Sequence, residues 1–414
     1  MIMDRIHSQI EKCRNGKLLE YQQPLNFCLI VIFFLVLAYR IYACFQVPTT
    51  TTDALRNLGY ASHALENNFA IYTTKAEDFM PEIWTRYWPK TPYIYPPVTL
   101  IFFYIFSIFH LGMFWVKLTL TLIELACSYL FYKWISKVAA ILFFCAPVSI
   151  WYTSHEGEFE ALLTLFLILS TLAVKDKHWH LAGFLLAISI QVKQLGILIA
   201  PWMLYEMWRE QNSDSFIHVL WKVTQGVALG FVPFLGYYLQ KPDLWLLPFS
   251  MLSGLKEISD MYAWNLIKKH GLIPIHFRSL ITYISLVILL IAFIYARKKV
   301  ETIVSFLPLA SFIFVMKSLQ VVREWYFIFS PSFLFCFLQR KTLIYFLLAN
   351  HLIHGLIFIP TILGNYSDSG ISFYLMKESQ ETIYLMESCM FTCNVKPTPK
   401  NSYSGSVLGE VHLQ

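Results

Sequence analysis

The chain has 414 residues, of which 57% are hydrophobic and only 14% are charged. An ordinary soluble domain carries roughly 25% charged residues, and such a fold could not hide this much apolar surface from water. The net charge of +6 is modest, and the basic residues lie in short clusters between apolar runs, without the stripe that nucleic acid requires. The composition excludes a soluble protein and argues against nucleic acid as a partner, and it predicts an all-α, polytopic integral membrane protein.

The first 24 residues carry the basic residues Arg5, Lys12, Arg14 and Lys17, and an apolar run from Leu25 to Val47 follows them. No small-residue cleavage site follows this run, so we expect a retained span and not a cleaved signal peptide. Several later runs are shorter than the ~20 residues of a straight span. These later runs cover residues 96–114, 115–134, 138–152, 159–174, 181–208, 219–239, 277–296, 303–315, 325–338 and 343–363. The sequence predicts about 11 transmembrane helices, within a range of roughly 10 to 12.

Basic clusters between the runs predict the orientation, because cytoplasmic loops are enriched in Lys and Arg. One arrangement puts every cluster in the cytoplasm together with residues 1–24. It requires 96–114 to be a helix at the outer interface and 181–208 to be a hairpin that turns near Lys193. The clusters are Lys133 and Lys137, Lys175 and Lys177, Arg209, Arg297 to Lys299, and Arg340 and Lys341. We therefore predict a transmembrane domain at 25–363, with an outer loop at 48–95, and an outer, flexible tail at 364–414.

The predicted outer loop carries the first candidate site residue. Asp53 follows four threonines and precedes a helical pattern at 55–65. Asp53 could be a plain helix N-cap, a functional carboxylate, or both. The loop ends in Tyr95-Pro96-Pro97-Val98, where the prolines favour the start of the interfacial helix.

A second acidic segment lies in the predicted outer turn Thr153–Glu158 and at the start of the next apolar run. It contains His155, Glu156, Glu158 and Glu160. These groups could bind a metal, position an acceptor, or raise one another's pKa. The alternative is that the acidic residues simply favour a helix N-terminus.

Three cations fall on the same predicted side as these carboxylates: Lys117, Lys193 and Arg323. This arrangement is expected for a phosphate clamp. The lysines could instead extend toward lipid headgroups, and Arg323 could pair with Glu324. Glu124 lies deeper in the same predicted span as Lys117, which suggests a partner on another span.

The predicted tail adds two features whose meaning depends on the compartment. Cys389 and Cys393 could form a disulfide or remain free, and Asn365-Tyr366-Ser367 is a glycosylation sequon that matters only in the endoplasmic reticulum. The bacterial inner membrane and the endoplasmic reticulum membrane are both compatible with the sequence.

The order of four features resembles the GT-C superfamily of membrane glycosyltransferases. These features are the first span, the early acidic residue in a long outer loop, the Tyr-Pro-Pro-hydrophobic motif and the acidic second turn. Three segments are most similar to its polyprenyl-phosphate-mannose-dependent branch, which includes the first mannosyltransferase of glycolipid-anchor synthesis and bacterial lipid mannosyltransferases. They are Thr52–Arg56, Asn68–Tyr72 and Tyr95–Val98. The resemblance implies juxtamembrane helices in the first outer loop.

The resemblance also implies roles for single residues. Asp53 matches the catalytic base, although many relatives have a paired acidic motif where this chain has Ala54. Lys193 matches a basic position between the fifth and sixth helices, and Glu160 matches an acidic site residue. The segment Arg323-Glu324-Trp325-Tyr326 is similar to a late outer motif near the lipid donor.

The function expected from this resemblance is transfer of a hexose, with mannose as the first candidate, from a polyprenyl-phosphate donor to a hydroxyl of a glycan, lipid or protein. The transfer inverts the anomeric carbon and takes place on the periplasmic or lumenal face. Lys193, Arg323, Lys117 and His155 are expected at the donor phosphate, and Tyr95, Trp325 and Tyr326 at the donor or lipid interface. No cofactor is firmly implied, a divalent metal lacks a supporting ligand pattern, and an accessory subunit is an open question.

Two other classes remain alternatives on the sequence. In a transporter or flippase, Glu124, Glu160 and Lys193 would line an ion pathway, but no clear internal repeat supports this class. A ligase or acyltransferase that uses a lipid carrier would need a base such as His155.

Overall fold

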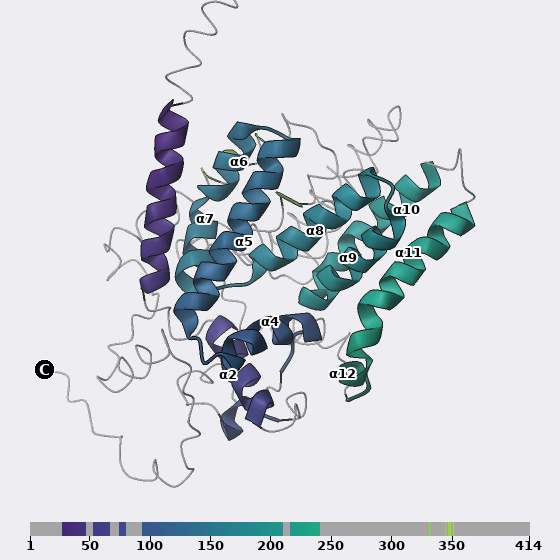
Figure 1. Ribbon diagram of the computed structural model, residues 1–414, viewed down its shortest axis with the longest axis horizontal. Helices are drawn as coiled ribbons and strands as arrows, with labels where there is room; N and C mark the ends of the chain where they lie inside the picture. Colours follow the sequence, from purple (N-terminus) through teal and green to yellow (C-terminus); the bar gives the residue numbers. More distant parts are fainter. Residues whose placement is uncertain are drawn as a thin grey trace, which may run out of the picture.

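The computed structural model describes residues 27–46, 53–66, 74–79, 93–209 and 216–240, with a few positions between 331 and 351. Within these residues the chain forms helices and loops and no strand (Figure 1). The predicted spans from residue 277 onward cannot be compared with the structure as whole elements. Arg323, Trp325, Tyr326 and the tail from 364 all lie outside the described residues.

In chain order, the first of the described helices is Phe27–Phe45. After it come α2 (Asp53–Glu66), the short helix η2 (Ala76–Asp78), α4 (Pro97–Ile108), α5 (Met113–Trp134), α6 (Lys137–Phe144), α7 (Pro147–Ser149), the π-helix η3 (Ile150–Glu156), α8 (Glu160–Lys175), α9 (Trp179–Val192), η4 (Gln194–Ile199), α10 (Ala200–Arg209), α11 (Phe216–Phe231), η5 (Val232–Phe234) and α12 (Leu235–Gln240).

Three helical segments in the described part of the chain are long and apolar enough to cross a membrane: Phe27–Phe45, Met113–Trp134 and Phe216–Leu239. A fourth crossing is formed if α6 and Pro147–Glu156, which meet at a 43° bend, make one broken span. The prediction of an all-α membrane protein is confirmed at this level. The number of about 11 spans stays a prediction.

The helix predicted at the outer interface is α4, and it is shorter than its apolar run. It has 12 residues, which corresponds to ~18 Å and is well below the ~30 Å of a hydrocarbon core. Pro97 begins it and Pro96 precedes it in an extended conformation, as expected for proline at a helix start. His110 takes a left-handed φ of 53°, so residues 113 and 114 belong to α5 and not to the interfacial segment.

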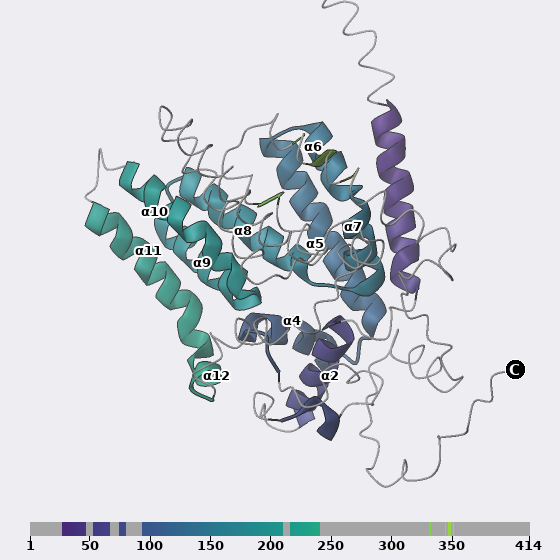
Figure 2. The same ribbon diagram turned by 180° about the vertical axis from the view of Figure 1, so that it is seen from behind.

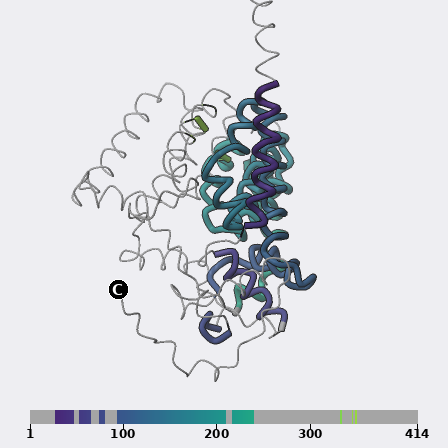
Figure 3. The backbone as a smooth tube through the Cα atoms, turned by 90° about the vertical axis from the view of Figure 1, so that its left-hand side faces the viewer, coloured from purple at the N-terminus to yellow at the C-terminus, as the bar shows by residue number. Residues whose placement is uncertain are grey.

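α2 and α4 pack together at one end of the bundle formed by the longer helices (Figures 1 and 2). Ser62 on α2 donates to Ser107 on α4 at 3.1 Å, and Thr99 on α4 donates to the carbonyl of Val192 at 2.7 Å. Figure 3 shows the first helix alongside the bundle and the α2 region beyond its end. This layer of short helices positions Asp53 close to the ends of α5, α8 and α9.

The chain reverses direction at Lys193, where the sequence predicts the turn of a hairpin. α9 ends at Val192, Lys193 is extended, and η4 packs back on the preceding turn. A Cβ on Gly196 would lie 2.8 Å from the backbone nitrogen of Ile190, so only glycine fits this return. At the far end of α8, the Lys175 ammonium lies 5.3 Å from the ring centre of Trp202 in α10.

The turn predicted at Thr153–Glu158 is shorter in the structure. Residues from Ile150 to Glu156 continue as a π-helix, and Gly157 ends it with a left-handed φ of 80°. Arg40, from the first helix, donates to Ser154 at 3.0 Å and to Ser149 at 2.5 Å. The helix thus covers four of the residues predicted to form a turn, Thr153 to Glu156.

Candidate functional site

Asp53 is the first residue of α2, and its carboxylate is held by a tyrosine from another segment. The Tyr95 hydroxyl donates to Asp53 Oδ2 at 2.5 Å. The backbone N–H of Asp53 donates to Glu158 Oε1 at 3.3 Å, which satisfies one of the free N–H groups at the start of α2. The Asp53 side chain therefore does more than cap its own helix, because it joins α2 to the segment before α4.

Gly157 allows the second acidic segment to approach the start of α2. A Cβ at this position would lie 2.8 Å from Met113 Cε and 3.4 Å from the Cβ of Ala54. Ala54 is fully buried, so an acidic side chain there would enter this contact. This packing gives a physical reason why the chain has Ala54 where the resembling family often has a second carboxylate.

Glu158, which accepts the backbone N–H of Asp53, and Glu160 are almost completely buried. Lys193 forms an ion pair with Glu160 Oε1, and its ammonium lies 4.5 Å from the ring centre of Phe159 and 5.6 Å from that of Tyr95. Burial, followed by the charges of Asp53 and Glu160, raises the pKa of Glu158 well above its usual value. The cluster thus gathers several carboxylates around one lysine.

The other predicted site residues on this face already have partners. Lys117 is fully buried and donates to the carbonyl of Gln46 at 2.5 Å. His155 Nδ1 lies 2.9 Å from Glu156 Oε1, and its ring stacks on Trp151 at 4.3 Å between centres. Lys193 contacts the Asp53–Tyr95 pair through the Tyr95 ring.

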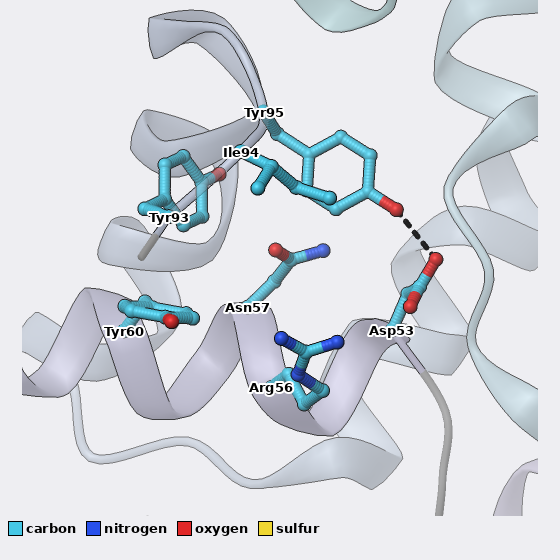
Figure 4. A pocket seen from close by; sticks show the side chains of 7 residues that line it. All are labelled: Asp53, Arg56, Asn57, Tyr60, Tyr93, Ile94 and Tyr95. Carbon is cyan, nitrogen blue, oxygen red and sulfur yellow. Dashed lines mark hydrogen bonds between the residues drawn. The ribbon is translucent and has the colours of Figure 1, made fainter. Parts of the chain in front are cut away.

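A pocket opens beside Asp53. Its lining comes from α2 and from the three residues before Pro96 (Figure 4). The lining residues are Asp53, Arg56, Asn57, Tyr60, Tyr93, Ile94 and Tyr95. Burial raises the pKa of Tyr60 to about 12, partly opposed by the neighbouring Arg56 guanidinium, so Tyr60 keeps its proton at neutral pH.

Five of these pocket residues are absent from the sequence-based candidates: Arg56, Asn57, Tyr60, Tyr93 and Ile94. A signal for three of them was present, since Asp53, Arg56, Asn57 and Tyr60 have the spacing i, i+3, i+4, i+7 of one helical face. Most residues on the remaining faces of α2 are alanine or leucine. Tyr93 offers no comparable pattern.

A metal would need several ligands in close proximity. In the part of the chain that the structure describes, no three His, Cys, Asp or Glu side chains are grouped in a way that could hold a metal ion. The acidic cluster is instead built around Lys193.

Comparison with known protein families identifies the chain's class. The family model of glycosyltransferase family 87 matches residues 93–318, more than half of the 414 residues. The chain belongs to glycosyltransferase family 87. This membrane glycosyltransferase shows no match among curated proteins or solved structures.

The family 87 match begins at Tyr93 and so includes Tyr95, the Glu156–Glu160 segment and Lys193. Asp53 and Arg56 precede the matched region. The fold brings both residues close to the matched region, because α2 packs against α4 and Tyr95 donates a hydrogen bond to Asp53.

Proposed function

We propose that this family 87 glycosyltransferase moves a hexose, with mannose as the first candidate, from a polyprenyl-phosphate donor to an acceptor hydroxyl, using Asp53 as general base. The observation that carries the proposal is the position of Tyr95. Its hydroxyl holds the Asp53 carboxylate, and its ring contacts the Lys193 ammonium. Tyr95 thus contacts both a candidate base, Asp53, and a cation, Lys193. These two groups suit a displacement in which the base deprotonates a hydroxyl while the cation stabilises a departing phosphate.

The reaction is a single inverting displacement. The acceptor oxygen loses its proton to Asp53 and attacks the anomeric carbon of the donor. The bond between that carbon and the phosphate oxygen breaks, and the electron pair leaves with the polyprenyl phosphate. General-base assistance of this kind is worth ~10²–10⁴-fold in rate.

Lys193 is the proposed partner of the leaving phosphate. Its charge is shared with Glu160, and Phe159 and Tyr95 shield it from water. Charge stabilisation is stronger in a partly dehydrated site. Arg323, Trp325 and Tyr326 remain proposed donor contacts and lie outside the described residues. To bind the phosphate, Lys117 would have to leave the carbonyl of Gln46, and His155 would have to leave Glu156.

Support for a lipid donor comes from the location of the site. Glu160 begins the apolar helix α8 and Lys193 follows the apolar helix α9, and a polyprenyl chain could lie along such helices with its phosphate at their ends. The proposed location is the periplasmic or lumenal side of a bacterial inner membrane or of the endoplasmic reticulum. The proposed acceptor is a hydroxyl of a glycan, a lipid or a protein.

A donor panel tests the proposal. Membranes that contain the protein are supplied with labelled hexoses attached either to polyprenyl phosphate or to a nucleotide. We expect transfer only from the polyprenyl-phosphate donors, and a roughly 10²-fold lower rate for Lys193→Met. Lys177→Met removes an exposed lysine at the far end of α8 and serves as the matched control. Transfer from nucleotide donors alone would contradict the proposed donor class.

A further inference from the structure

One face of α2 forms a polar stripe against the segment Tyr93–Tyr95. Asp53 and Tyr60 lie at its two ends, with Arg56 and Asn57 between them, and Figure 4 shows the Asn57 amide directed between the rings of Tyr93 and Tyr95. The stripe therefore places hydrogen-bonding groups within one helical turn of the proposed base.

Two donors in this stripe are buried without a hydrogen-bond partner in the described part of the chain: Arg56 Nε and Asn57 Nδ2. Their residues are only 8% and 1% exposed. A buried polar group that makes no hydrogen bond is costly, and native proteins keep few of them. Two such groups that line one pocket are explained if a ligand accepts their hydrogen bonds.

The lining decides what kind of ligand fits. Arg56 and Asp53 carry opposite charges, so the pocket lacks the excess positive charge that a free phosphate would select. Aromatic rings from Tyr60, Tyr93 and Tyr95 provide apolar walls around the donors. Apolar walls with a few well-placed polar groups favour a neutral ring that bears several hydroxyls.

We propose that Arg56 and Asn57 donate hydrogen bonds to neighbouring hydroxyls of the acceptor's ring, a sugar or a cyclitol, and so present another hydroxyl to Asp53. This proposal rests on the proposed function, because it assigns the acceptor side of that reaction. Arg56 and Asn57 then determine acceptor specificity, whereas Lys193 acts on the donor side of Tyr95.

Direct binding tests the proposal on the full-length protein in lipid nanodiscs. The probes are methyl α-mannopyranoside, myo-inositol and inorganic phosphate, and saturation-transfer NMR measures their dissociation constants. We expect the protein to bind at least one of the two polyols, and the preferred one distinguishes a sugar from a cyclitol. A charged hydrogen bond corresponds to roughly a tenfold to hundredfold change in affinity, and a neutral one to roughly a twofold to tenfold change. We expect the larger loss for Arg56→Gln and the smaller for Asn57→Ala, with phosphate binding unchanged.

Arg56→Lys and Lys75→Gln complete the design. Arg56→Lys keeps the positive charge but removes the guanidinium Nε, so it should also weaken polyol binding if directed hydrogen bonds are responsible. Lys75→Gln removes an exposed cation that pairs with Glu77 at 3.7 Å and should change nothing. Each variant's thermal unfolding midpoint is compared with that of the parent, and Asn57→Ala decides the outcome if the Arg56 variants do not fold.

Some results would overturn the inference. Polyol binding that is absent in the parent, or that survives all three pocket substitutions, would show that the stripe does not hold a hydroxylated ring. Loss of phosphate binding alone in the Arg56 variants would show an anion site instead. If the donor panel shows no transfer, the proposed function fails, and the binding experiment still decides whether the pocket recognises a polyol.

Discussion

Glu158 has an unusual environment for a carboxylate. It is buried, it accepts the backbone N–H of Asp53, and the carboxylates of Asp53 and Glu160 lie nearby. Burial and these negative charges both favour its protonated form. The pKa of Glu158 is accordingly raised well above its usual value, so we expect the folded protein to bind this proton more tightly than the unfolded chain does.

The raised pKa predicts how stability depends on pH. The stabilisation that comes from protonated Glu158 is complete below the ordinary pKa of a glutamate and is lost as the pH rises through the raised value. Glu158→Gln is neutral at every pH and loses this dependence. The melting temperature of the variant relative to the parent should therefore increase from pH 5 to pH 9.

Glu77→Gln is the matched control for Glu158→Gln, because Glu77 is exposed and pairs with an exposed lysine. We expect its melting temperature to follow that of the parent across the same pH series. A constant difference between Glu158→Gln and the parent would mean that Glu158 does not hold a proton in the folded state.

At the residue scale, the sequence predicted those site residues whose charged side chains interrupt a hydrophobic run. Lys193 interrupts an apolar run and Glu160 begins one, and both lie in the candidate site. Arg56 and Asn57 lie in an ordinary amphipathic helix, where polar residues are expected on the solvent side. Only the packing of Tyr93 and Tyr95 against α2 turns that face into a pocket wall, and this contact depends on tertiary structure.

At the scale of helices, α9 and α11 approach each other through small residues. A Cβ on Gly226 would lie 2.0 Å from the carbonyl oxygen of His180, and one on Gly183 would lie 2.2 Å from that of Val223. Gln191 also donates to the carbonyl of Gly230 at 2.6 Å. Glycines four residues apart allow close helix contact inside membranes.

Gly226→Leu should separate α9 from α11. The new side chain would meet backbone atoms, which cannot rotate away, so we expect a loss of at least ~1–3 kcal/mol in unfolding free energy, together with lower transfer activity. Ala228→Leu is the control, since Ala228 is exposed on the same helix. Equal thermal stability of the two variants would show that α9 and α11 do not depend on this contact.

A buried ion pair joins the first helix to α5. Arg40 donates to Glu124 at 2.8 Å, and both side chains are fully buried. Arg40 also donates to the carbonyl of Phe144 through Nε at 3.0 Å. The sequence predicted that Glu124 pairs with another span but did not identify Arg40, because helix pairing in space is not visible in a single sequence.

Arg40→Met should be strongly destabilising because it leaves the Glu124 charge buried and unpaired, at a cost of ~3–5 kcal/mol. The double variant Arg40→Met with Glu124→Leu removes both charges and should recover part of that loss. Chemical denaturation of both proteins in the same detergent measures the difference. If the double variant is no more stable than Arg40→Met, the unpaired carboxylate is not the source of the penalty.

At the scale of the whole molecule, the described helices have two chemically different ends. Met113 and Glu160 begin α5 and α8 near α2, whereas Lys133 and Lys175 lie in the last turns of the same helices. α8 alone separates its two ends by ~24 Å. The sequence predicted this separation from charge alone, through the positive-inside rule, but the number of spans and the identity of the membrane stay predictions.

The most direct test of the account is the transfer rate of Asp53→Asn with a labelled polyprenyl-phosphate hexose. Asparagine keeps the size of the side chain but cannot accept the acceptor's proton, so we expect a rate ~10²–10⁴-fold below that of the parent. Asp78→Asn, at an exposed position in the same predicted outer loop, should retain the parent rate. Parent-like transfer by Asp53→Asn would contradict the assignment of Asp53 as the base.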